Sequence, residues 1–102
     1  MNILITGDNV DITPEIKELV DEKIDTKLDP HLAHFAPEIK TAALKISRQT
    51  KTGNFEVNLD MMLPGKMHVY AKAANSRLDS ALIDLREQIE RQIEKYKADL
   101  RR

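Results

Sequence analysis

Residues 76–102, SRLDSALIDLREQIERQIEKYKADLRR, decide how the rest of the chain must fold. Apolar residues recur there at spacings of three and four, which predicts one stripe along a long amphipathic helix. The stripe consists of Leu78, Leu82, Leu85, Ile89, Ile93, Tyr96 and Leu100. We expect Ser76 to cap this helix, with Asp79 at the third helical position as a variant of the capping box. The upstream chain must supply the surface that covers the stripe.

A second amphipathic helix is predicted near the N-terminus. Thr13 is placed to cap it, and the proline that follows suits the first helical position. The apolar stripe of this helix consists of Ile16, Leu19, Val20, Ile24 and Leu28. We expect Pro30 to end or bend the helix near Asp29, although Leu32 and Phe35 could continue the stripe after a kink.

Between the helices the apolar period changes from 3.6 to two, which predicts three β-strands separated by turns at Gly53-Asn54 and Pro64-Gly65. The inward-facing residues are expected to be Ala42, Leu44, Ile46, Phe55, Val57, Leu59, Met61, Val69, Ala71 and Ala73. Strands joined by such turns pair antiparallel. Residues 2–7 predict one further strand at the start of the chain.

The predicted order is therefore β-α-β-β-β-α, and the fold class is α+β. Each strand has one apolar face, and the two helices have apolar stripes to cover it, so we expect both helices on one face of a four-stranded sheet. The sequence contains no repeats, low-complexity segments or linkers. Residues 1–102 are accordingly expected to form a single domain.

Composition excludes several classes of protein. The chain has no cysteine, so it forms neither disulfides nor thiolate metal sites. It contains no apolar run long enough to span a bilayer and does not start like a secretory signal, so we expect a soluble cytoplasmic protein. His31 and His34 could share a helical face, but no other ligands cluster with them, so no metal site is predicted. The sequence also lacks a nucleophile motif and a glycine-rich phosphate loop, and we expect no cofactor and no enzymatic activity.

Charge is segregated along the chain although the net charge is only −1. Residues 13–29 carry six acids against three lysines, whereas residues 40–72 carry six bases against two acids. The last twelve residues carry five bases against two acids. The sequence therefore predicts a cationic face for an acidic partner. On this ground Lys45, Arg48 and Arg86 are candidate binding residues.

The final helix supplies further candidates. Arg91 and Lys95 lie one turn apart, and Lys97 is expected at the rim of the same surface. An alternative is a solvated face laced with ion pairs to Glu87, Glu90 and Glu94, and composition leaves this choice open. On the exposed sheet face, an isolated tyrosine does not favour the stacking of RNA bases, which uses paired aromatic residues.

Two segments resemble the ribosome hibernation-promoting factor family, which includes ribosome-associated inhibitor A (protein Y) and the sigma-54 modulation proteins. They are the opening NILITGDNVDITPEIKELV, residues 2–20, and the closing LDSALIDLREQIERQIEKYK, residues 78–97. The resemblance implies a fold similar to double-stranded RNA-binding domains. It also implies a non-enzymatic protein that binds the small ribosomal subunit and its rRNA in the mRNA and tRNA channel, silencing translation in stress or stationary phase.

By position, the resemblance assigns RNA contacts to Lys23 and Lys27, and to the RQ-x-x-K-x-K ending at Arg91, Lys95 and Lys97. Because the sequence ends at Arg102, it resembles the short family form, which acts with a separate ribosome modulation factor to pair ribosomes into inactive dimers. Neither a membrane nor DNA is an expected partner. Two alternatives remain: a module that binds free structured RNA, and a protein-interaction adaptor that uses the acidic first helix.

Overall fold

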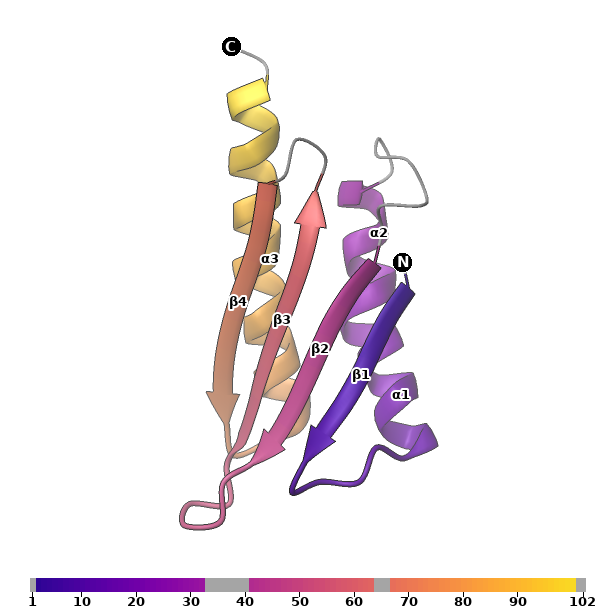
Figure 1. The fold of residues 1–102 in the computed structure, drawn as a ribbon, viewed down its shortest axis with the longest axis vertical. Coiled ribbons are helices and arrows are strands. Elements are labelled where there is room, and N and C mark those ends of the chain that lie inside the picture. The colour runs from indigo at the N-terminus through magenta and orange to yellow at the C-terminus, as the bar shows by residue number, and fades with distance from the viewer. Residues whose placement is uncertain (1, 33–40, 64–66, 101–102) are drawn as a thin grey trace.

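The structure is a computed structural model that describes residues 2–32, 41–63 and 67–100. A four-stranded sheet forms one layer, and the helices form a second layer on one of its faces (Figure 1). The elements are β1 (Asn2–Asp8), α1 (Pro14–Val20), the π-helical turn η1 (Asp21–Asp25), α2 (Thr26–Leu32), β2 (Thr41–Arg48), β3 (Phe55–Leu63), β4 (Met67–Asn75) and α3 (Leu78–Leu100). The predicted α+β class and element order are confirmed.

The strands lie in the order β1-β2-β3-β4. The last three form the predicted antiparallel meander, with Ile46 opposite Val57 and Leu59 opposite Ala71. In contrast, β1 pairs with β2 in parallel, because the chain crosses through the first helix before it returns to the sheet. Gly53 lies in the first predicted turn with a positive φ of 72°, which glycine adopts without steric cost. The second predicted turn, at Pro64-Gly65, lies outside the described residues.

The first helix begins as predicted, because the Thr13 hydroxyl accepts a hydrogen bond from the Ile16 N–H at 3.3 Å. Of the two outcomes expected at Pro30, the helix does not end near Asp29: α1, η1 and α2 run on through Pro30, and Leu32 continues the stripe, as the alternative predicted. Its fully buried residues, Val20, Ile24, Leu28 and Leu32, are spaced by four. An ideal α-helix would rotate such a row steadily away from the sheet, and the wider π-helical turn offsets part of that rotation. Phe35, expected to extend the stripe, lies outside the described residues.

The final helix buries the middle of its predicted stripe, Leu82, Leu85, Ile89 and Ile93, but begins differently. The Ala81 N–H donates to the Arg77 carbonyl at 3.1 Å, which makes Leu78 the first helical residue. The prediction that Ser76 caps this helix was wrong, because its hydroxyl donates to Asn75 Oδ1 at 3.4 Å. The same Asn75 oxygen accepts the Arg77 N–H at 3.1 Å, so an Asx turn leads into the helix.

The core lies between the two layers. It combines the inward residues of β2, β3 and β4 with the stripes of both helices, and none of the described charged or polar residues is buried within it. Its largest fully buried side chains are Ile24, Leu28, Leu32, Leu44, Ile46, Leu59, Leu82, Leu85, Ile89 and Ile93. This packing fixes which flank of each helix remains outside. Among the described residues, no helix is both long enough and apolar enough to cross a membrane.

Candidate nucleic-acid interface

The two flanks of α3 have different neighbours. One flank lies against α2, where His31 Nδ1 is 2.9 Å from Glu94 Oε1. The other flank lies along β4, where Gln92 Nε2 donates to the Tyr70 carbonyl at 2.7 Å. On helical spacing, Arg86 and Lys97 belong to the α2 flank, whereas Arg91 and Lys95 lie on the outer surface toward β4. Lys97 therefore lies closer to α2 than Arg91 does, although Arg91 lines a recess together with Glu94, the partner of Lys97.

The cations on the α2 flank belong to a run of ion pairs, here called the α2–α3 ion-pair chain. Arg86 Nε lies 3.0 Å from Glu90 Oε1, and the other Glu90 oxygen lies 3.9 Å from His31 Nε2. His31 contacts Glu94 in turn, and Glu94 Oε1 lies 3.6 Å from Lys97 Nζ. The His31 hydrogen bond, together with the nearby Lys97 charge, holds the pKa of Glu94 below its ordinary value.

This chain limits what Arg86 and Lys97 can offer to a ligand. Their side chains are only 19% and 16% exposed, so most of each stem is packed against the protein. Their charges also face carboxylates that a phosphate would have to replace. In the free protein both residues are therefore engaged by glutamates of their own helix, and the contacts of His31 join that helix to α2.

Arg91 and Lys95 differ from Arg86 and Lys97 both in the exposure of their side chains and in the pairing of their charges. Both are exposed, and no carboxylate among the described residues forms an ion pair with either of them. Arg91 Nε donates to the backbone carbonyl of Glu87 at 3.3 Å, not to its carboxylate. The sequence left open whether the helix glutamates neutralise these bases. In the structure Glu90 and Glu94 contact the residues of the α2–α3 ion-pair chain, and Arg91 and Lys95 are accessible.

Lys23 and Lys27 lie on the same helical layer. They precede His31 by eight and four residues, which places them in one row on the flank of the first helix that faces α3. Lys23 is 28% exposed, and its Nζ lies 3.5 Å from Glu22 Oε1, whereas Lys27 is exposed. Six predicted binding residues thus lie on the helical layer. Lys23, Lys27, Arg86 and Lys97 lie toward the contact between the two helices, and Arg91 and Lys95 lie further round α3.

Lys45 and Arg48 are not part of this surface. Lys45 projects from β2 on the open face of the sheet, with its Nζ 4.0 Å from Asp8 Oδ2. Arg48 lies at the end of β2 with its guanidinium 5.2 Å from the centre of the Phe55 ring, a cation–π contact. The predicted binding residues therefore divide into a helical set of six and a sheet set of two.

The open sheet face carries charges that are paired with one another. Lys72 Nζ lies 3.0 Å from Glu56 Oε1, and this contact lowers the pKa of Glu56 and raises that of Lys72. His68 is hydrogen-bonded to Asp60. Tyr70 is 49% exposed and is the one large aromatic side chain exposed on the described part of this face. The arrangement does not form the stacking platform that RNA-recognition sheets use.

His31 is the residue whose role the sequence did not reveal. Its contacts with Glu90 and Glu94 join residues about 60 positions apart, and no local pattern indicates them. His34, which was predicted as a residue that could share a helical face with His31, lies outside the described residues. Within the described ranges, no group of three or more His, Asp or Glu residues is placed to hold a metal ion.

Solved structures of other proteins share this architecture. A ribosomal subunit interface protein from Coxiella burnetii is 27% identical, with a TM-score of 0.73 over 96% of this chain and 99% of that one. The N-terminal domain of Protein Y from Thermus thermophilus is 24% identical, with a TM-score of 0.72 over 94% of this chain and 99% of that one. The fold is that of the ribosome hibernation factors. No curated protein matches the chain.

The family follows from the sequence comparison. Residues 3–101 match the model of the sigma 54 modulation protein / S30EA ribosomal protein family, and the chain belongs to this family. It is a family of non-enzymatic, ribosome-associated proteins that regulate translation. The resemblance seen in the sequence is thereby confirmed.

Proposed function

We propose that residues 1–102 act as one domain that binds the small ribosomal subunit in the channel for mRNA and tRNA. The domain would contact rRNA phosphates and silence translation sterically in the cytoplasm during stress or stationary phase. With a separate ribosome modulation factor it would promote inactive ribosome dimers. One observation supports the site: Arg91 and Lys95 are exposed on α3, with no ion-pair partner among the described residues, in a chain from a ribosome-associated family.

Phosphate binding explains why this surface suits a folded RNA. Lysine and arginine contacts to phosphates release counterions and need no particular base sequence. Arg91 and Lys95 can make such contacts without first breaking an ion pair, and Lys27 adds a third exposed cation on the same layer. Helical spacing places most acids of the first helix away from Lys23 and Lys27, although Glu22 lies 3.5 Å from Lys23. The low net charge of the chain therefore need not prevent binding. A rigid body held in this way blocks the channel by occupying it.

Co-sedimentation with purified small subunits tests the proposal. Binding should weaken steeply as salt rises, and the double variant Arg91→Glu/Lys95→Glu should fail to pellet with subunits at salt concentrations where the parent still binds. Arg77→Glu is the control for charge reversal on α3, because Arg77 lies at the start of the helix and pairs with Asp79. If the double variant pelleted as well as the parent, the assignment of the site would be wrong.

Further binding assays separate the alternative functions. Equal affinity for a naked RNA duplex and for intact subunits would favour a general RNA-binding module. Capture of a protein partner from nuclease-treated extract, with no ribosomal material, would favour an adaptor. A sucrose-gradient profile of stationary-phase cells with and without the protein then shows whether ribosomes accumulate as dimers or as silenced single particles.

A further inference from the structure

A recess of about 500 Å³ lies between α2 and α3. His31 lines it from α2, and its α3 side consists of Glu87, Glu90, Arg91 and Glu94. Three carboxylates therefore share a recess with Arg91, the residue that we expect to contact RNA phosphates. Their negative charge repels phosphate unless cations offset it, so the charge of His31 bears directly on binding at Arg91.

The two ring nitrogens of His31 face different carboxylates. Nδ1 lies 2.9 Å from Glu94 Oε1, and Nε2 lies 3.9 Å from Glu90 Oε2. A neutral imidazole carries a proton on one nitrogen only, whereas the imidazolium carries one on each and can serve both glutamates. The side chain is 29% exposed, so it can exchange a proton with solvent.

The fixed charges around His31 on α3 balance one another. The three glutamates of the recess are matched by three cations, which are Arg91 in the recess and the ion-pair partners of Glu90 and Glu94, Arg86 and Lys97. Among these side-chain types, only histidine ordinarily changes its charge between about pH 5 and pH 8. A proton on His31 therefore turns a neutral cluster into one with a net positive charge.

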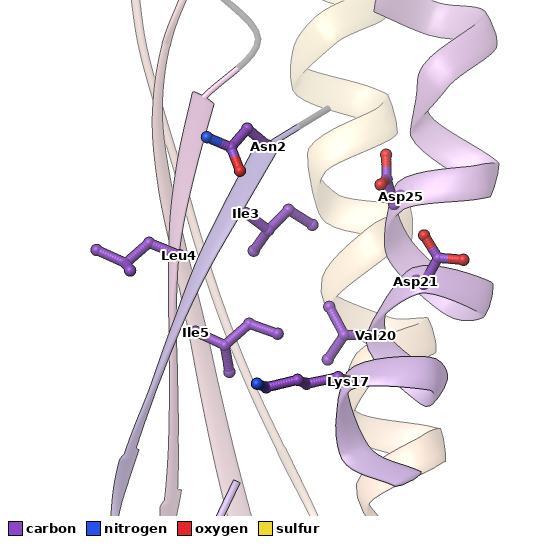
Figure 2. A pocket seen from close by; sticks show the side chains of 8 residues that line it. All are labelled: Asn2, Ile3, Leu4, Ile5, Lys17, Val20, Asp21 and Asp25. Carbon is purple, nitrogen blue, oxygen red and sulfur yellow. The ribbon is translucent and has the colours of Figure 1, made fainter. Parts of the chain in front are cut away.

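The first helix adds no acid to this cluster. Lys27 precedes His31 by one helical turn and lies on the same flank. Figure 2 shows Asp21 and Asp25 beside a different recess, between β1 and the first helix, and helical spacing places Asp29 in their row. The carboxylates that face His31 from the described residues thus come from α3 alone.

We propose that protonation of His31 regulates binding of the small ribosomal subunit, so that affinity rises as the pH falls through the titration of the ring. A polyanion binds more tightly to the form with the extra positive charge, and binding therefore takes up a proton. When His31 is neutral, the glutamates of α3 weaken the contact of Arg91 with phosphate. When His31 is charged, this effect is offset. The inference rests on the proposed function, because it concerns the regulation of the same surface.

Co-sedimentation with purified small subunits at about pH 6 and about pH 8, at one low ionic strength, tests the inference. The parent should bind about threefold to fivefold more tightly at the lower pH. His31→Gln, neutral at both pH values, should bind equally at both, at the weaker level. His31→Lys, charged at both, should bind equally at both, at the tighter level. His68→Gln is the matched control and should keep the pH dependence of the parent, because His68 is also hydrogen-bonded to a carboxylate, that of Asp60, but on the open sheet face.

A second measurement needs no variant. The affinity of the parent should change over the pH range in which the His31 ring titrates, followed by NMR of the free protein. The inference is overturned if the parent binds equally at both pH values, if His31→Gln keeps the pH dependence of the parent, or if the ring titrates outside the range in which affinity changes. A parent that pellets with subunits at neither pH overturns the proposed function, and this inference with it.

Discussion

Replacing Arg91 with glutamine should weaken ribosome binding more than replacing Arg86 with glutamine. Both changes remove one positive charge from α3, and the two positions are five residues apart. Their surroundings differ, because Arg86 is 19% exposed and its Nε lies 3.0 Å from Glu90, whereas Arg91 is exposed and bonded only to a backbone carbonyl. Long-range electrostatics therefore change equally, and only the local availability of the guanidinium distinguishes the two variants.

The expected magnitudes follow from those contacts. Loss of one phosphate contact lowers the slope of log K against log salt by about 0.7 to 0.9, and we expect this for Arg91→Gln. Arg86→Gln should change the slope by less than half as much. For stability the order reverses: Arg86→Gln loses a partly buried ion pair and packing of its stem, about 1 kcal/mol or roughly 4–8 °C in Tm. Arg91→Gln should stay within about 0.5 kcal/mol of the parent.

The assay measures binding to small subunits by co-sedimentation at a series of salt concentrations, and Tm by differential scanning calorimetry. The parent protein and Arg77→Gln serve as references, since Arg77 lies outside the helical set of cations. A slope for Arg86→Gln that falls as far as that for Arg91→Gln would refute the reasoning. It would mean that the α2–α3 ion-pair chain opens on the ribosome and releases its cations.

Three further outcomes are expected. Gln92→Ala removes two hydrogen bonds from the β4 edge, which should cost about 1–2 kcal/mol in urea unfolding and increase self-association seen by light scattering. Gly7→Ala would place a Cβ 2.3 Å from the Val10 carbonyl oxygen, so unfolding free energy should fall by about 1–3 kcal/mol. The pKa of Glu94 is lowered in the folded state, so its carboxylate stabilises the fold above the ordinary glutamate pKa, and this stabilisation is lost as the pH falls below that value. Glu94→Gln should therefore reduce the drop in Tm between about pH 6 and pH 3, measured by thermal unfolding.

Local patterns in the sequence account for most of the architecture. The spacing of three and four that includes Ile89 and Ile93 identifies a helix with one buried side, and both residues are fully buried. The alternation through Leu44 and Ile46 identifies a strand with one buried face in the same way. Such periods repeat within a few residues, so they can be read without knowing what the segment packs against.

The first helix shows where local rules were overridden. Pro30 disfavours a continuing helix, yet the helix continues to Leu32, whose side chain is fully buried against the sheet. Burial of such a side chain is worth about 1.5–3 kcal/mol, comparable with the cost of an interior proline. The π-helical turn and the parallel pairing of β1 likewise depend on how the layers fit, which no single segment contains.

For the binding residues too, residue order explains one part and the tertiary structure another. Charge segregation and the family resemblance identified the cations, because both are properties of the residue order alone. Which of them are accessible depends on the fold. His31 meets Glu94 across 63 positions, and Arg86 and Lys97 are left only 19% and 16% exposed beside Glu90 and Glu94 of their own helix. Residue order therefore specifies the two apolar surfaces that must meet, and the way they meet leaves Arg91 and Lys95 free, since a charge pairs with whatever folding brings within a few ångströms.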